Sequence, residues 1–229
     1  PSQIFGSLQS NGTVWLFNPR GIVFGANSQV DVGGLLASTL SISNEDMASG
    51  RLMLSRLGQG AGAIRSEGEI NANGGSVVLV APELTQSGRI SAGRIGLAAA
   101  TQVEVDVEGD GLIFFNARND GSLGARLKQL GTLTADGGTV EMRAAARAGF
   151  ADTVLNLDGV VQARSIGRRE GRIVIDGGAD GVTAVSGKLD ATGQAAGERG
   201  GDIAVLGQKV GLTGSAELDA SGMAGGGGI

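Results

Sequence analysis

Aliphatic and polar residues alternate along most of this chain, and from residue 68 onward the alternation comes in copies of one short pattern. The pattern is Gly, any residue, an aliphatic residue, any residue and Ala. Copies occupy residues 68–72, 88–92, 131–135, 159–163 and 187–191, and a last copy at 216–220 has Ala in place of the leading Gly. A period of two residues predicts a β-strand with one buried and one exposed face. Each copy is therefore predicted to be a strand that buries its aliphatic residue and its Ala.

A second strand is predicted after each copy, because another Gly-led alternating segment follows a short turn. Examples are residues 75–79, 138–142, 171–175 and 201–205. The inward positions of both strands are predicted to form aliphatic ladders: Ile70, Val77, Leu79, Ile90, Val140, Met142, Ile173, Ile175, Leu189, Ile203 and Leu218. The glycines are expected to supply the backbone freedom that the corners between strands require.

The spacing of the copies predicts a solenoid. Steps between their central aliphatic residues are 20, 43, 28, 28 and 29 residues, and self-similarity at such periods is typical of repeat architectures. We interpret the step of 43 residues as two coils, one of them degenerate. Because no segment keeps a helical period, the chain is predicted to be all-β: a right-handed parallel β-helix (β-solenoid) of about 8–11 coils.

Two segments depart from this repeat. Residues 44–66 begin with Asn44, Glu45 and Asp46, a pattern that predicts a short helix with Asn44 as its cap. Residues 109–130 are predicted to be a second excursion from the coils.

Composition narrows the class of protein. The net charge of −5 and the pI near 4.8 argue against nucleic acid or an anionic membrane as a partner. A hydrophobic fraction of 41% is too high for a disordered chain. The absence of His excludes His-based catalytic triads and His-ligated zinc, and the absence of Cys excludes disulfides and thiolate metal sites. The sequence therefore predicts no cofactor, no metal site and no catalytic residue.

Outward-facing Asp residues are the remaining candidates for chemistry. Asp190 and Asp219 occupy equivalent places in successive copies, so they are expected to lie one coil apart. Paired carboxylates would suit a polysaccharide-processing β-helix enzyme, whereas outward acidic residues also keep a rod soluble and block lateral sheet pairing. A groove lined by three or more converging acidic or Arg side chains would favour the enzyme, and a smooth rod would favour an adhesin.

Loop lengths indicate where a partner would bind. From the Ala of a copy to the next inward aliphatic residue there are 5 positions in two coils, 10 between Ala163 and Ile173, and 12 between Ala191 and Ile203. Insertions at one corner of a solenoid map to one edge, which is often the binding edge. The first long loop contains the cations Arg164, Arg168, Arg169 and Arg172. It is a candidate binding loop for an anionic glycan or a surface partner, with a solvated basic loop as the alternative.

Residues 2–25 read SQIFGSLQSNGTVWLFNPRGIVFG, and residues 32–40 read VGGLLASTL. In this order, the segments closely resemble the secretion domain of filamentous-haemagglutinin-like exoproteins, which belong to the two-partner secretion pathway of Gram-negative bacteria. The resemblance points to the turn Asn18, Pro19, Arg20 and Gly21 as a secretion motif, although the family usually has Asn where this chain has Arg20. The same four residues suit an ordinary type I β-turn, with Asn first, Pro second and Gly fourth.

The resemblance implies a secreted, non-enzymatic exoprotein segment, exported through a dedicated outer-membrane transporter barrel and acting in adhesion or surface filament formation, either free or at the cell surface. Residues 1–120 would be the C-terminal part of the secretion domain and residues 121–229 continuing shaft coils. Because the repeat runs up to both ends of the chain, end-to-end self-association is also expected. The alternative function, from a different class, is the polysaccharide-processing enzyme.

Overall fold

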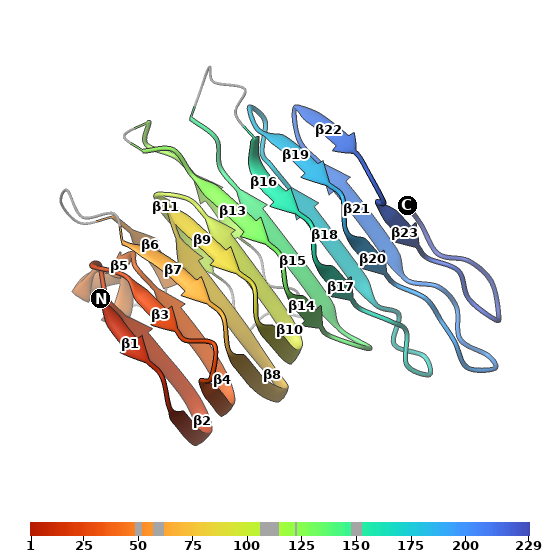
Figure 1. Cartoon of the computed structure of the whole chain (residues 1–229), viewed down its shortest axis with the longest axis horizontal. Helices are drawn as coiled ribbons and strands as arrows, with labels where there is room; N and C mark the ends of the chain where they lie inside the picture. Colours follow the sequence, from red (N-terminus) through yellow and green to blue (C-terminus); the bar gives the residue numbers. More distant parts are fainter. Residues whose placement is uncertain (49–51, 57–61, 106–114, 122, 148–152) are drawn as a thin grey trace.

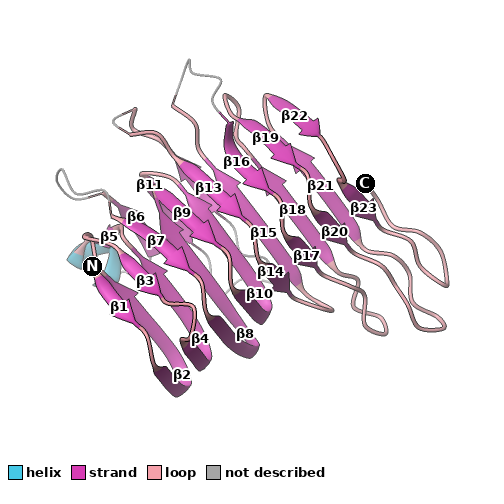
Figure 2. Ribbon diagram, viewed as in Figure 1, coloured by secondary structure: helices cyan, strands magenta, loops and turns pink. Residues whose placement is uncertain are grey.

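The chain winds into a parallel β-helix whose coils lie side by side along one axis (Figure 1). The computed structural model describes residues 1–48, 52–56, 62–105, 115–121, 123–147 and 153–229. Strands and loops make up nearly all of these residues, and within them one short helix lies beside the N-terminus (Figure 2). The all-β parallel β-helix predicted from the sequence is confirmed.

Two parallel sheets form the body of the helix. In the part of the chain that the structure describes, the first sheet has eight strands: β1 (Ser2–Ile4), β3 (Ile22–Phe24), β7 (Ala63–Ser66), β9 (Glu83–Gln86), β13 (Arg126–Gln129), β16 (Thr153–Leu157), β19 (Val182–Val185) and β22 (Lys209–Leu212). The second sheet begins with β2 (Ser7–Phe17), β4 (Gln29–Ser38), β8 (Glu69–Ala81), β10 (Arg89–Ala99), β14 (Thr132–Thr134), β17 (Val160–Gln162), β20 (Lys188–Asp190) and β23 (Glu217–Asp219). One strand of each sheet per coil gives eight coils, at the low end of the predicted number.

In the later coils, each strand of the second sheet is interrupted at a corner. The long strands β2, β4, β8 and β10 cross this corner without ending, and all three pairings between them show a register shift there. In the following coils the part beyond the corner becomes a separate strand: β15 (Thr139–Ala144), β18 (Arg172–Asp176) and β21 (Asp202–Leu206). The long loops predicted after Ala163 and Ala191 lie at this same corner, and they project from one edge of the molecule in Figure 1.

The repeated aliphatic residues form a continuous ladder. Ile70 pairs with Ile90, and the ladder continues through Leu133, Val161, Leu189 and Leu218 in successive coils. All are fully buried except Leu218, which is partly buried against the core. The interpretation of the 43-residue step as two coils is wrong, because Ile90 pairs directly with Leu133. One coil with an inserted excursion spans that step.

The leading glycines of the repeat are packed against one another. A Cβ added to Gly88, Gly131, Gly159 or Gly187 would lie well under 3.0 Å from the carbonyl oxygen of the leading glycine one coil earlier. None of these four glycines has a positive φ. The expectation that they serve backbone freedom is therefore wrong, since close approach between coils is what excludes a side chain here.

Two buried glutamines hydrogen-bond to the backbone of these leading glycines from inside the β-helix. Gln129 Nε2 donates to the carbonyl oxygen of Gly131 at 2.8 Å and to Gln86 Oε1 at 3.2 Å. Gln86 Nε2 in turn donates to the carbonyl oxygen of Gly88 at 2.7 Å. Both side chains are completely buried, and these bonds offset the cost of removing both amide nitrogens and Gln86 Oε1 from water, while Gln129 Oε1 accepts no hydrogen bond from the described residues.

Parts of the two predicted excursions join a small antiparallel sheet, but the predicted bound of 109–130 is wrong, because Arg126–Gln129 already form the coil strand β13. The order of the antiparallel sheet is β12 (Phe115–Arg118), β11 (Gln102–Val105), β6 (Leu52–Ser55) and β5 (Ser41–Ile42). Leu54 and Val103 from this sheet pack on outward residues of the second parallel sheet, namely Leu36, Val78, Val80 and Ala98, to form a second hydrophobic core. The first six residues of the predicted excursion 109–130 lie outside the described residues.

The predicted short helix is present as α1 (Asn44–Ala48), but Asn44 is not its cap. Ser43 Oγ accepts a hydrogen bond from the Asp46 backbone N–H at 3.0 Å and donates to Asp46 Oδ2 at 2.6 Å. Ser43 is therefore the N-cap of α1, and Asp46 lies at the third helical position.

Candidate functional site

The turn Asn18–Gly21 joins β2 to β3 at the corner between the two parallel sheets. The Gly21 backbone N–H donates to the Asn18 carbonyl oxygen at 3.0 Å, which closes a four-residue turn. The Arg20 backbone N–H donates to Asn18 Oδ1 at 2.9 Å, so the Asn18 side chain also shapes the turn. The β-turn predicted from these residues is therefore present.

Neighbouring segments hold this turn from several directions. Asn18 Nδ2 donates to Ser2 Oγ at 2.9 Å, and the Ser2 backbone N–H donates to the Gly21 carbonyl oxygen at 2.9 Å. On the other side, the Gly62 backbone N–H donates to the Pro19 carbonyl oxygen at 3.0 Å. Gly21 has φ of 112°, a conformation that strains any residue with a side chain. Pro19 and Arg20 remain exposed at the tip.

The candidate binding loop does not form a single cation cluster. Arg164 is held by Asp136, with Arg164 Nε 3.2 Å from Asp136 Oδ1 and Nη2 bonded to Oδ2 at 2.5 Å. Arg172 is exposed on β18, outside the loop itself. Arg168 and Arg169 are exposed in the loop, and of the four arginines named from the sequence, Arg164, Arg168 and Arg172 do not reach the hollow described next.

Asp136 has a pKa below its ordinary value because of this pairing. Burial raises the pKa of its carboxyl, but hydrogen bonds from the Arg164 side chain and backbone outweigh burial and lower it. Arg164, for its part, has a raised pKa owing chiefly to its hydrogen bonds with Asp136. The pair fastens the long loop of one coil to the corner of the coil before it.

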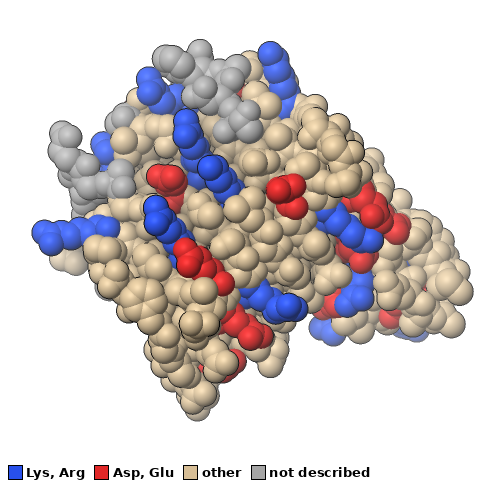
Figure 3. Space-filling model, in the orientation of Figure 1, with Lys and Arg blue, Asp and Glu red and all other residues tan. Residues whose placement is uncertain are grey.

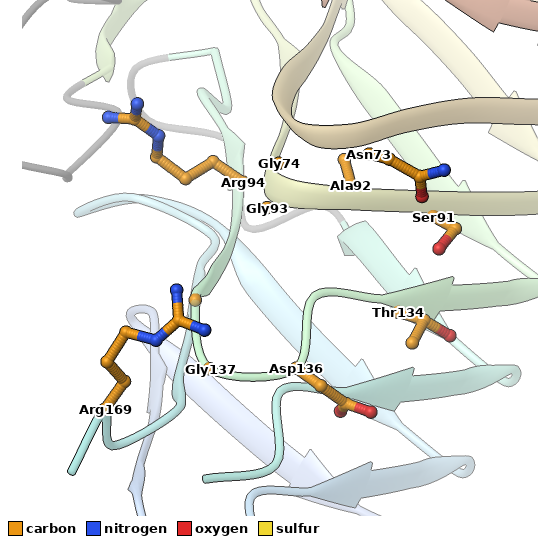
Figure 4. A pocket seen from close by; sticks show the side chains of 11 residues that line it. Asn73, Gly74, Ser91, Ala92, Gly93, Arg94, Thr134, Asp136, Gly137 and Arg169 are labelled. Carbon is orange, nitrogen blue, oxygen red and sulfur yellow. The ribbon is translucent and has the colours of Figure 1, made fainter. Parts of the chain in front are cut away.

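A hollow of about 550 Å³ lies beside this loop, at the corner of the second sheet (Figure 4). Its polar lining consists of Asn73, Ser91, Arg94, Thr134, Asp136 and Arg169, over a backbone floor of glycines. Arg94 and Arg169 lie on one side in Figure 4, and Asn73, Ser91 and Thr134 lie on the other. We call this feature the corner hollow.

The loop lengths contain a signal for the corner hollow that the prediction of the binding loop did not use. The next inward aliphatic residue, Ile95, follows Ala92 of the repeat by only three positions, whereas Val77 follows Ala72 by five. The corner of this one coil is therefore two residues shorter than that of its neighbour. Comparison of the loop lengths coil by coil would have predicted a recess here.

The outward carboxylates are engaged in the structure. Asp190 and Asp219 are register partners in adjacent coils, as predicted, but Asp190 is buried rather than exposed to solvent. Each accepts a hydrogen bond from the backbone N–H two residues later, Thr192 at 3.1 Å and Ser221 at 2.9 Å, so both shape turns. Asp176 pairs instead with Arg143 at 3.0 Å. Among the described residues no group of three or more His, Cys, Asp or Glu side chains could hold a metal ion.

Arg143 bridges two carboxylates on the outer face of the second sheet. Its guanidinium lies 2.6 Å from Glu141 Oε1 and 3.0 Å from Asp176 Oδ2. Burial raises the pKa of Glu141 above its ordinary value, against the opposing effect of Arg143. Acidic and basic side chains are likewise intermixed over the face shown in Figure 3, where no large area of one sign stands out.

The structure only partly matches the charged groove that would favour a polysaccharide-processing enzyme. Arg94, Arg169 and Asp136 line the corner hollow, which gives three charged side chains. They do not converge, because both Asp136 oxygens accept hydrogen bonds from Arg164 and its carboxylate points away from Arg94 and Arg169 in Figure 4. The described lining contains no second carboxylate to complete an acid–base pair.

Comparison with known proteins decides the family. A family model described as the TPS secretion domain, the secretion domain of the two-partner pathway, matches residues 1–205. The chain belongs to the TPS secretion domain family. The resemblance noted from residues 2–40 is thereby confirmed, and the chain is a segment of a secreted two-partner exoprotein. No curated protein matches the chain.

A solved TPS domain supports this membership. The chain is similar to the crystal structure of the HMW1 secretion domain from Haemophilus influenzae, with a TM-score of 0.74 and 27% sequence identity. The match covers 92% of this chain and 54% of that one, so this TPS segment spans about half of the solved chain. In the described part of the chain, no helix is long and apolar enough to cross a membrane.

Proposed function

We propose that an outer-membrane transporter barrel recognises this TPS segment during export, and that the Asn18–Gly21 turn is part of the recognised surface. The observation that carries this proposal is the rigid presentation of Pro19 and Arg20. The turn backbone is held by Ser2, Ser38 and Gly62, yet both side chains at its tip are exposed. A surface that is already ordered loses little conformational entropy when it binds a partner.

A structural role alone is the competing explanation for this turn. Asn18 and Gly21 would be required for the corner even without a transporter, because of their hydrogen bonds and the positive φ of Gly21. Arg20 separates the two explanations. Its side chain makes no hydrogen bond or ion pair with the described residues, so its removal leaves the corner intact.

The test is secretion of the full-length exoprotein by cells that also express its transporter. Arg20→Ala is expected to reduce secreted protein several-fold while its thermal midpoint stays close to that of the unmodified protein. Arg126→Ala, which removes an exposed arginine from β13, is the matched control and should leave secretion unchanged. Unchanged secretion of Arg20→Ala, or equal losses in both variants, would leave only the structural role.

We further propose that the exported protein acts in adhesion or surface filament formation at the cell surface. The extended row of coils supports this role, because a solenoid offers a long surface for contacts. The proposed division into a secretion-domain part, residues 1–120, and shaft coils, residues 121–229, rests on the sequence pattern alone. The sheets continue across it, since β9 pairs with β13 and β10 with β14.

A further inference from the structure

The corner hollow is built by a difference in length between neighbouring coils. The coils before and after it turn this corner with Gly74 and Gly137, whose φ values are 75° and 68°. The coil between them has only Gly93 between Ala92 and Arg94, and its register against β8 shifts there. The flanking corners therefore project beyond the middle one, and a recess remains.

A fourth coil closes one side of this recess. Arg169 lines the hollow although it belongs to the loop between β17 and β18. The loop is held in place by the pairing of Arg164 with Asp136 and by a hydrogen bond from the Gly167 backbone N–H to Glu198 Oε1 at 2.7 Å. Arg169 is thus presented to the recess by a loop that is fastened on both sides.

The charges of the corner hollow are unbalanced. The one carboxylate in its lining, Asp136, is already bonded to Arg164, which does not line the hollow. The guanidinium groups of Arg94 and Arg169 form no ion pair with the described residues. Arg94 is only partly exposed. Arg94 and Arg169 therefore line the same recess, and neither forms an ion pair with the residues described.

The uncharged lining favours a hydroxylated ligand. Asn73 can both donate and accept through its amide, and Ser91 and Thr134 can do so through their hydroxyls. Ala92 is the only apolar side chain of the described lining, so a hydrophobic ligand would find almost nothing to contact. A volume of about 550 Å³ is within the range of small-ligand sites.

We propose that the corner hollow binds a carboxylate-bearing sugar residue of an acidic glycan. Arg94 and Arg169 bind its carboxylate, since guanidinium groups match the planar geometry of that group. Asn73, Ser91 and Thr134 bind its hydroxyls. The inference deepens the adhesive role proposed above and does not depend on transporter recognition, so the failure of one is distinguishable from the failure of the other.

A hyaluronan tetrasaccharide, which carries glucuronate carboxylates, is the probe, and its carboxyl-reduced analogue is the neutral control. Binding to the chain is measured by titration calorimetry at low salt. Arg169→Gln and Arg94→Gln are each expected to weaken binding of the acidic probe about tenfold, the usual effect of losing a charge-assisted hydrogen bond. Arg168→Gln removes the same charge from a neighbouring exposed position outside the hollow, and it should leave the affinity unchanged.

A second variant tests the recess itself without changing any charge. Insertion of Asn-Gly between Ala92 and Gly93 copies the sequence of the preceding coil, Ala72-Asn73-Gly74-Gly75, and fills the hollow with a normal corner. This variant should keep its thermal midpoint and its secretion, and lose binding of the acidic tetrasaccharide.

Three results would overturn the proposal. The first is no detectable binding of the acidic tetrasaccharide to the unmodified chain. The second is equal binding of the carboxyl-reduced analogue. The third is an equal loss of affinity in Arg168→Gln, which would show that general charge attraction, not the corner hollow, holds the probe.

Discussion

At the scale of single residues, the leading glycines explain why the repeat is so regular. Each one lies against the backbone of the coil before it, so the position tolerates no side chain. The sequence alone predicts that glycine recurs there, but it does not distinguish backbone freedom from close packing. Only the contact between coils, which joins residues 20 to 43 positions apart, makes that distinction.

Gly131→Ala is therefore expected to destabilise the chain by about 1–3 kcal/mol or more, the usual cost of overpacking. The added methyl group would collide with backbone atoms of Ser87 and Gly88, which cannot move without disturbing the preceding coil. Gly6→Ala is the control, because nothing lies within 4 Å of its added Cβ. Urea unfolding followed by circular dichroism measures both variants, and equal stability of the two would argue against the glycine ladder.

The pairing of Asp136 with Arg164 predicts a dependence of stability on pH. Because the pKa of Asp136 is lowered in the folded chain, its ionised form stabilises the fold, and this contribution is fully present above the ordinary value of 3.8. It is lost as the pH falls below that value through the folded pKa. Asp136→Asn should cost up to about 1 kcal/mol at neutral pH, since the pair is partly exposed.

Denaturant unfolding of the unmodified chain and of Asp136→Asn, measured from pH 7 down to about pH 2.5, checks this expectation. The difference between the two should shrink below pH 3.8. A difference that stays constant through the acid range would show that the carboxylate charge contributes nothing.

At the scale of elements, the parallel strands follow from local pattern and the antiparallel sheet does not. Alternation within five residues is enough to predict the strands at 68–72 or 187–191. The sheet of β5, β6, β11 and β12 joins segments about fifty residues apart, and no local periodicity shows that Leu54 will lie against Val103. The error over the 43-residue step has the same origin, because β11 and β12, which lie within that step, join β6 in the antiparallel sheet instead of forming a further coil.

The inward ladder predicts a severe effect of a buried charge. Ile173→Asp should destabilise the chain by several kcal/mol, because Ile173 is completely buried and no cation in its ladder could pair with the new carboxylate. Val160→Asp is the matched control, since Val160 faces outward on β17 beside Lys188 in the next coil. Thermal unfolding of both variants tests the assignment, which an equal loss of stability would contradict.

At the scale of the whole molecule, the sequence is sufficient to predict the fold and the family, whereas it predicts only part of the corner hollow. Its recess follows from a corner that is shorter than those of the two flanking coils, which the sequence shows as the step of three positions from Ala92 to Ile95. Its second cation does not, because Arg169 reaches the hollow from a different coil along a loop fastened by Asp136. Loop placement of this kind depends on contacts between coils.

The central claim is that this chain is part of an export domain served by a separate transporter. The most direct measurement is the amount of full-length exoprotein in the medium of cells that carry or lack the partner transporter. We expect secreted exoprotein only in the presence of the transporter, with the protein retained in the cells when the transporter is absent. Equal amounts in both media would contradict it.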